Sequence, residues 1–384
     1  MKFSGETKIL LAAVNNVSLA ISLRSDLAIM KGILFLLRGN DLILSGYDTD
    51  IAVRTVVNVE GETDGGIVIP ARKIKDLLRT LTGDTVCFEM NANYIIKITS
   101  EETKSEITGY DETGYPEFPV VKNEESEFTV NSEELKNMIN RTIFSVSKHE
   151  ANPVFTGELF KMRDGILEIS AVDGTRLSLN KRKTKHEHDF EFIVPGRSLN
   201  ELIKIIGEST NIGVSSGKKE NNEEKEDENV KIRFDSKHAI FNVGKYEFIT
   251  RLLAGKFFDY TERIQRPGTT FTYADTQSLI ETMEKMMVFS DEKSKSSVRL
   301  NIRDNELDFC YKGITEKIQD IVHAEKQGDD LEIEFNPRYI LEALKACNHD
   351  RVMISFAGEI SPIIIQPIEG DEFLYFILPI RIKK

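Results

Sequence analysis

Apolar residues recur at helical spacing in six segments of the chain, and shorter alternating runs separate these segments. In residues 71–81, for example, Ile74, Leu78 and Leu81 form one apolar stripe, and residues 197–206 repeat it. Such a stripe is typical of an amphipathic helix that packs on a sheet. We therefore expect six helices, at residues 6–21, 71–81, 131–147, 197–206, 275–289 and 337–346.

The runs between these helices alternate between apolar and polar residues, as half-buried strands do. Leu42-Ile-Leu-Ser and Ile166-Leu-Glu-Ile-Ser are two examples, and both lead into turns that contain an aspartate. Alternation with period two is typical of antiparallel sheets that have one covered face. The pattern predicts an α+β fold in which pairs of helices pack on antiparallel sheets.

One unit of this pattern occurs three times. A short apolar run, a proline and a helical stripe follow one another in residues 67–81, 192–206 and 333–346. Proline suits the first turn of a helix, where no amide hydrogen is needed. The same distance along the chain separates Asp48 from Asp173 and Pro70 from Pro195. We expect three tandem domains: residues 1–123, residues 128–265 with an acidic insertion at 217–229 that has no apolar residue, and residues 270–384.

Composition places the chain among ordinary globular proteins. Its three cysteines are far apart in sequence and form no C-x-x-C pair, which argues against disulfides and zinc and for a reducing compartment. No run approaches the roughly 18–20 apolar residues of a membrane helix. We expect a cytoplasmic protein.

The formal net charge of −13 argues at first against a nucleic-acid partner. The six expected helices, however, together carry a slight positive charge. The largest contribution comes from the helix at residues 71–81, which has four cations, Arg72, Lys73, Lys75 and Arg79, and one anion, Asp76. If equivalent helices share one side, that side is basic within an acidic body and could guide a polyanion. The alternative is that these charges belong to ordinary solvated helix faces, which would give the same net charge on the helices.

No motif for catalysis or cofactor binding is present. The chain has no Walker loop, since Gly213-Val-Ser-Ser-Gly-Lys-Lys219 has the wrong spacing, and it has no G-x-G-x-x-G. Asp48 and Asp173 could be offered as catalytic carboxylates, but Asp in such turns usually caps its own backbone. His186-Glu-His188 has no third ligand nearby. We predict no catalytic residue, no metal site and no cofactor.

Eight fragments, in order and in register, resemble bacterial DNA polymerase III beta subunits, the beta sliding clamps. The fragments are Met1-Lys-Phe, Ile69-Pro-Ala-Arg-Lys, Asn152-Pro-Val-Phe-Thr-Gly, Ala171-Val-Asp-Gly-Thr-Arg-Leu, Ile193-Val-Pro, Gly255-Lys-Phe-Phe-Asp-Tyr, Phe335-Asn-Pro-Arg-Tyr and Tyr375-Phe-Ile-Leu-Pro-Ile-Arg-Ile.

The resemblance implies three clamp domains per chain and a head-to-tail homodimer closed into a ring. Duplex DNA would pass through the ring, a clamp loader would open it, and the chain itself would catalyse no reaction. The DNA polymerase catalytic subunit and repair proteins would insert short peptides into a pocket between the second and third domains.

The resemblance also implies site residues. Those matching DNA-facing positions are Arg24, Arg72, Lys73, Arg79, Lys148, His149 and Arg197. Those matching the peptide pocket are Phe155, Val172, Gly174, Thr175, Arg176, Leu177, Phe258, Asn336, Tyr339, Ile360, Pro362, Leu378, Pro379, Ile380 and Arg381.

The chain departs from the family pattern at several positions. Asn152 stands where the family usually has Arg, and Phe258 stands where it has Pro. The Arg that follows Asp-Tyr comes one place late, at Arg263, so we do not expect Arg263 in the pocket. Two alternatives remain: a clamp-fold scaffold of a phage or mobile element without the main replicative role, and an enzyme of unrecognised type.

Overall fold

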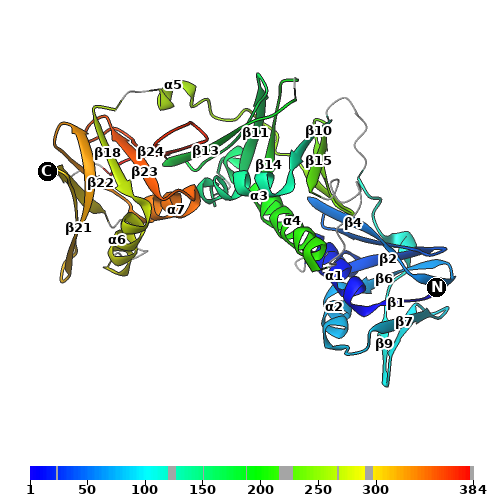
Figure 1. The fold of residues 1–384 in the computed structure, drawn as a ribbon. Coiled ribbons are helices and arrows are strands. Elements are labelled where there is room, and N and C mark those ends of the chain that lie inside the picture. Colours follow the sequence, from blue (N-terminus) through cyan, green and yellow to red (C-terminus); the bar gives the residue numbers. More distant parts are fainter. Residues whose placement is uncertain are drawn as a thin grey trace. The chain divides into compact units, whose positions relative to one another are not determined.

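The computed structural model describes residues 1–22, 25–119, 127–149, 151–186, 188–215, 228–265, 268–289 and 297–380 (Figure 1). It divides into two compact units. The first consists of Met1–Lys136 and Arg197–Leu252, and the second of Asn137–Gly196 and Leu253–Lys384. Across the described residues, no helix is long and apolar enough to cross a membrane.

The first unit contains two antiparallel sheets, of five and eight strands. In spatial order, the five-stranded sheet consists of β5 (Glu60–Thr63), β1 (Lys2–Glu6), β7 (Thr85–Met90), β8 (Ile95–Ser100) and β9 (Thr103–Thr108). The eight-stranded sheet consists of β10 (Glu127–Asn131), β15 (Asn229–Phe234), β16 (His238–Val243), β17 (Tyr246–Arg251), β4 (Ile51–Asn58), β3 (Asp41–Tyr47), β2 (Gly32–Arg38) and β6 (Gly65–Pro70).

Two helices of the first unit, α1 (Thr7–Val17) and α2 (Ala71–Thr80), pack against each other. Helix α2 buries Ile74 and Leu78 and leaves Arg72, Lys73 and Arg79 exposed, as the apolar stripe predicted. Burying the stripe supplies most of the stability of such a short helix, which would be marginal in isolation.

The second unit is built on one twelve-stranded antiparallel sheet. In spatial order, its strands are β14 (Phe190–Pro195), β11 (Gly157–Arg163), β12 (Ile166–Val172), β13 (Arg176–Lys183), β25 (Phe373–Ile377), β24 (Ile363–Pro367), β23 (Arg351–Phe356), β18 (Thr270–Asp275), β21 (Lys317–Gly328), β20 (Glu306–Lys312), β19 (Val298–Arg303) and β22 (Leu331–Phe335).

Helices α6 (Thr276–Phe289) and α7 (Pro337–Cys347) pack together in this unit. Leu279 and Met283 of α6 and Leu344 of α7 are buried in one core with strand residues such as Tyr375. A further short helix of the unit, α5 (Thr261–Ile264), is a single turn in the segment that follows β17.

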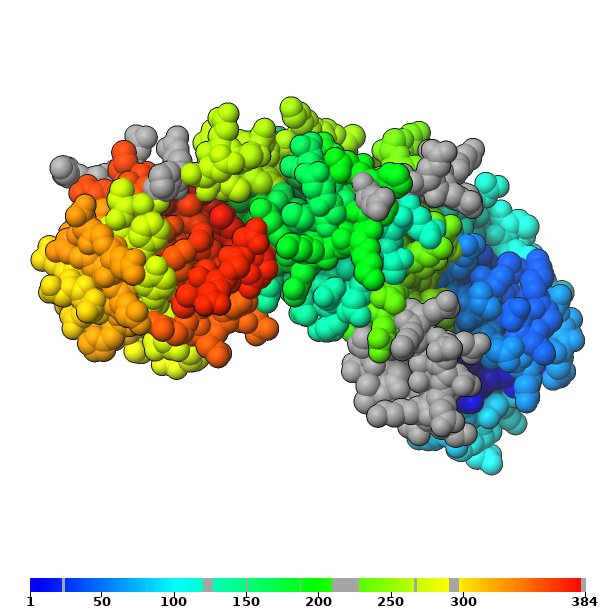
Figure 2. Space-filling model, turned by 45° about the horizontal axis from the view of Figure 1, so that its top comes forward, coloured from blue at the N-terminus to red at the C-terminus, as the bar shows by residue number. Residues whose placement is uncertain are grey.

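Backbone pairing joins segments that are far apart in the sequence. In the first unit β4 pairs with β17, and in the second β13 pairs with β25. Figure 2 shows the second pairing from outside, where the C-terminal segment (red) lies against the middle of the chain (green). The eight-stranded and twelve-stranded sheets therefore each continue from one part of the threefold sequence repeat into the next, whereas the five-stranded sheet lies within the first part.

The helices differ from the sequence prediction mainly at their ends. The helix expected over 131–147 is α3 (Ser132–Asn140), followed by a single 3-10 turn at Ile143–Ser145. The hydroxyl of Thr142 donates to the carbonyls of Met138 and Ile139, at 3.0 and 3.2 Å, and so satisfies the end of the helix. The helix expected over 6–21 ends at Val17, and the one expected over 197–206 is the longer α4 (Gly196–Ser215).

The prolines of the repeat also differ from the prediction. Only Pro337 lies in the first turn of a helix. Pro70 and Pro195 end strands β6 and β14, immediately before their helices. The residue before a helix has extended backbone, and the fixed φ of proline suits that position too.

A fully buried carboxyl group, Glu158 on β11, lies in the second unit. Its neighbour Leu159 contacts the core on the other face of the sheet, since successive strand residues point to opposite faces. Glu158 Oε1 lies 2.8 Å from the Thr142 hydroxyl oxygen, within hydrogen-bond distance, and among the described residues Oε2 has no hydrogen-bond partner. Burial raises the pKa of Glu158 well above its usual range.

Glu158→Gln is expected to stabilise the protein more at pH 8 than at pH 5. In the unfolded chain the carboxyl ionises near its ordinary pKa, whereas the folded protein keeps it protonated because its pKa is raised. Stability therefore falls as pH rises between those two pKa values. Glutamine does not titrate, so its advantage should grow to about 1 kcal/mol or more at pH 8.

Urea unfolding at both pH values measures this difference. Glu191→Gln, an exposed position on the neighbouring strand β14, is the matched control and should be neutral at both. An equal effect of Glu158→Gln at pH 5 and pH 8 would contradict a buried, neutral carboxyl.

Candidate functional site: an apolar pocket and a basic helix

The floor of a pocket in the second unit is one row of residues across neighbouring strands. Val172 on β12 pairs with Leu177 on β13, and Leu177 pairs with Phe376 on β25. Residues that are directly opposite on paired strands point to the same face of the sheet. The three side chains therefore form a continuous apolar strip.

The segment after β17 covers part of this strip. Phe257 packs edge-on against Phe155, with ring centroids 6.3 Å apart, and both belong to the core beneath the segment. The Tyr260 hydroxyl donates to the Glu168 carboxylate, and its oxygen accepts from the Ser170 hydroxyl at 3.1 Å. Burial raises the pKa of Tyr260 above its usual range, and the nearby Glu168 charge raises it further. These contacts anchor the covering segment on the sheet.

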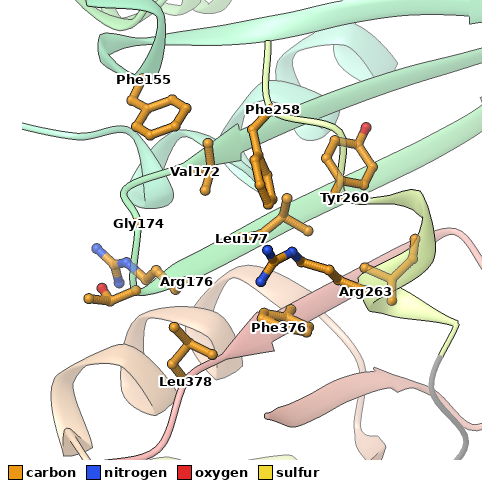
Figure 3. Close-up of a pocket in the computed structure, with 12 residues that line it drawn as sticks. Phe155, Val172, Gly174, Arg176, Leu177, Phe258, Tyr260, Arg263, Phe376 and Leu378 are labelled. Atoms are coloured by element: carbon orange, nitrogen blue, oxygen red, sulfur yellow. The ribbon is translucent and has the colours of Figure 1, made fainter. Parts of the chain in front are cut away.

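The uncovered part of the strip is a cavity of about 230 Å³ (Figure 3). Its walls are mainly apolar, with a few polar groups, as in most sites that bind small molecules or peptide side chains. The lining residues are Phe155, Val172, Gly174, Thr175, Arg176, Leu177, Phe258, Tyr260, Arg263, Ile264, Phe376 and Leu378.

One rim of the cavity is the turn between β12 and β13. Asp173 Oδ1 accepts hydrogen bonds from the amides of Thr175 and Arg176, at 2.9 and 3.1 Å. Gly174 has a φ of +91°, which a residue with a side chain adopts only with strain. The Leu378 amide donates to the Thr175 carbonyl at 2.9 Å, so the turn also holds the C-terminal segment in place.

Arg176 is a structural brace at this rim. Its side chain is largely buried, and its Nε donates to Asp173 Oδ2 at 2.9 Å. The guanidinium also donates to Glu342 of α7 and to the Phe144 carbonyl, and it lies 4.5 Å from the Tyr339 ring centroid. Two carboxylates thus neutralise its charge. Removing the side chain would leave the two carboxylates without a counter-charge and the Phe144 carbonyl without a donor. A loss of binding in Arg176→Ala could therefore reflect a loss of stability as well as a lost contact with the peptide.

The second candidate site is the exposed face of α2 in the first unit. Arg72 and Arg79 both form exposed ion pairs with Asp76, at 3.8 and 3.3 Å. Exposed pairs of this kind hold the side chains only weakly. A groove on this face is lined by Ser18, Ile21, Ala71, Arg72, Lys75, Asp76 and Arg79. The face is basic and accessible to a polyanion.

Other proteins resemble this chain over its whole length. Three family models match it in order: the N-terminal domain of the DNA polymerase III beta subunit at residues 1–119, the central domain at 129–222 and the C-terminal domain at 266–381. The chain belongs to the DNA polymerase III beta subunit family. As a member of this family it is a DNA sliding clamp with three clamp domains, a non-catalytic processivity subunit.

Named relatives agree with this assignment. The beta sliding clamp of Halalkalibacterium halodurans is 28% identical over 396 residues, covering 99% of this chain and 100% of the relative. That of Staphylococcus epidermidis is 29% identical over 392 residues, covering 99% of both chains. The crystal structure of the DNA polymerase sliding clamp from Bacillus subtilis has a TM-score of 0.91 at 26% identity and covers 100% of both chains.

The clamp structure brings together eight of the residues predicted for the pocket. They are Phe155, Val172, Gly174, Thr175, Arg176, Leu177, Phe258 and Leu378, and all of them line the cavity. Sequence comparison missed Tyr260, Ile264 and Phe376, and the exclusion of Arg263 from the pocket was wrong. The alternation Leu374, Phe376, Leu378 could have indicated Phe376, because these residues lie on one face of the terminal strand and its extension.

Seven other residues predicted for the pocket do not line this cavity of the clamp. Asn336 caps α7 by accepting from the Arg338 amide at 3.0 Å, and Tyr339 packs on Arg176. Ile360 is 75% exposed outside the cavity, and Pro362 lines a smaller cavity beside it. Pro379 and Ile380 continue the terminal segment, and the Ile380 amide donates to the Glu334 carbonyl. Arg381 is outside the described residues.

The positions predicted to face DNA are distributed over both units of the clamp. Arg72, Lys73 and Arg79 are exposed on α2, and Lys148 and His149 are exposed in the second unit. Arg24 lies outside the described residues.

Arg197, the remaining position predicted to face DNA, is engaged within the clamp. Its half-exposed guanidinium bonds to the buried Asp48 carboxylate. That carboxylate also accepts from the Ile51 amide at 2.9 Å, so Arg197 holds the turn before β4.

Asp48 and Asp173 cap their own turns, as predicted. Within the part of the chain that the structure describes, no group of three His, Cys, Asp or Glu side chains could hold a metal ion. The rings of His186 and His188 lie 5.7 Å apart, and Glu187 is outside that part.

Proposed function

We propose that two copies of this clamp close head to tail into a ring around duplex DNA. The ring would tether the DNA polymerase catalytic subunit and repair proteins through peptides that enter the cavity between the middle and third clamp domains. A clamp loader would open the ring, and we place the protein in the cytoplasm. We assign the domains to residues 1–123, 128–265 and 270–384. The observation that carries the proposal is the apolar cavity of about 230 Å³ on the Val172–Leu177–Phe376 strip.

Two open strand edges support the head-to-tail pairing. Among the described residues, β9 pairs only with β8, and residues 317–323 of β21 pair only with β20. Exposed edges of this length invite association with another chain unless they are paired. A contact between β9 of one copy and β21 of the next would cover both, and two such contacts close a twofold ring.

Binding by enclosure suits the modest basic character of α2. A ring that is held by topology needs few phosphate contacts, so affinity for short linear duplexes should be weak and should fall as salt rises. The proposed DNA-facing residues remain Arg24, Arg72, Lys73, Arg79, Lys148, His149 and Arg197. Of these, Arg197 should contribute least, because Asp48 already holds its guanidinium.

Charge reversal on α2 tests the DNA-facing surface. Arg72→Glu combined with Lys73→Glu should reduce loading onto circular DNA by about tenfold or more, because two cations near phosphates become anions. Dimer mass and peptide binding should not change. The control is Arg163→Glu with Lys183→Glu, the same charge change at exposed strand positions. Normal loading by the α2 variant, or equal loss in the control, would contradict this placement.

A further inference from the structure

Two arginines line the apolar cavity, and only one of them is neutralised. Asp173 and Glu342 bind the guanidinium of Arg176. The guanidinium of Arg263 lies over the Phe258 ring, 5.2 Å from its centroid, and has no carboxylate partner among the described residues. Figure 3 shows the Arg263 side chain extending between Leu177 and Phe376, toward the middle of the cavity.

The apolar strip continues past Arg263. Phe376 pairs with Ile364 on β24, and Ile364 pairs with Ser355 on β23. A smaller cavity lies over this continuation, and Arg263 and Phe376 line both cavities. Arg263 therefore stands where the two cavities meet. The smaller cavity is lined by Arg263, Gly268, Ser355, Ala357, Pro362, Ile364 and Phe376.

An unpaired guanidinium at an apolar site favours one class of occupant. A peptide that covers Arg263 with apolar groups alone removes water from the cation and returns no counter-charge, which costs free energy. A carboxylate in the same place restores the lost interactions through two parallel N–H···O bonds, a geometry that suits the planar guanidinium. Stacking on Phe258 already restricts the side chain, so forming those bonds would cost less conformational entropy.

We propose that Arg263 makes this clamp select partner peptides that carry an acidic side chain next to their apolar anchors. The inference rests on the proposed peptide-binding function of the cavity and adds a specificity determinant to it. The anchors occupy the Val172–Leu177–Phe376 strip, and the carboxylate binds where the two cavities meet.

Matched synthetic peptides test the proposal. A short fluorescent peptide with two large apolar anchors is prepared in neutral form and with Glu or Gln substituted in turn at each position beside the anchors. Anisotropy with the full-length clamp at low salt should show one position where Glu binds about three- to tenfold more tightly than Gln. Raising the salt should reduce that preference, because the cation is partly exposed.

Variants of the clamp identify the cation responsible. In Arg263→Gln the preference for Glu should disappear while the neutral peptide still binds, and in Arg263→Glu it should reverse. Lys256→Gln is the matched control, since Lys256 is an exposed cation of the same segment that does not line either cavity. That variant should keep the full preference for Glu.

The possible outcomes separate this inference from the function on which it rests. Equal binding of Glu and Gln peptides at every position, or a preference that persists in Arg263→Gln, would overturn the selectivity and leave the peptide pocket standing. Failure of wild-type clamp to bind any peptide, including the neutral one, would overturn the pocket function and the selectivity together.

Discussion

Leu378→Ala is expected to weaken binding of a polymerase-derived peptide by about tenfold or more while the clamp stays folded and dimeric. Leu378 is 40% exposed and lines the cavity beside Phe376, so a peptide anchor would bury it further. Truncating such a contact commonly costs more than about 1–2 kcal/mol, or roughly a factor of ten in affinity. Fluorescence anisotropy measures the loss directly.

Ile360→Ala provides a matched control. Ile360 was predicted to lie in the pocket, but it is 75% exposed and does not line the cavity. Its truncation should leave peptide affinity within about twofold of the wild type. Unchanged affinity in Leu378→Ala, with a loss in Ile360→Ala, would show that the cavity has been placed wrongly.

Val288→Asp combined with Ile321→Asp is expected to convert the dimer to monomers at micromolar concentration. Val288 is 80% and Ile321 is 48% exposed, on α6 and on the open edge of β21, two elements that pack together. If these side chains are buried between copies, each aspartate places an unpaired charge in the interface, which costs several kcal/mol. Light scattering should then give one copy of 43.6 kDa instead of two.

Ile368→Asp serves as the control for this variant. Ile368 is an exposed apolar residue of the same domain, next to β24 and away from the open edge of β21. Its replacement should leave the dimer intact. A double variant that remains dimeric would mean that this end of the third clamp domain is not the interface.

Features that depend on local sequence could be predicted well. The stripe of Ile74 and Leu78 identified α2 and its exposed cations, because burial in so short a helix follows directly from spacing. The capping roles of Asp48 and Asp173 were also correct, since each carboxylate binds amides only two or three residues ahead. In both cases the groups that interact are neighbours in the chain.

Features that depend on long-range pairing could not be predicted from spacing. The pocket floor requires β13 to pair with β25, which brings Leu177 opposite Phe376, and no local pattern specifies that pairing. Motif matching then shifted Arg263 by one place and excluded it, although its position over Phe258 depends on how the covering segment folds. The brace at Arg176 likewise depends on Glu342, which a distant helix supplies.

The central claim is that the clamp encircles DNA, and the decisive measurement is its retention on circular and linearised DNA. Labelled clamp is placed on a nicked circular plasmid by a clamp loader, separated from free protein by gel filtration, and the plasmid is then cut once. The account predicts that the clamp stays with the circle and is released when the DNA is cut, because a sliding ring leaves over a free end. Equal retention before and after cutting would contradict enclosure and indicate binding to the DNA surface instead.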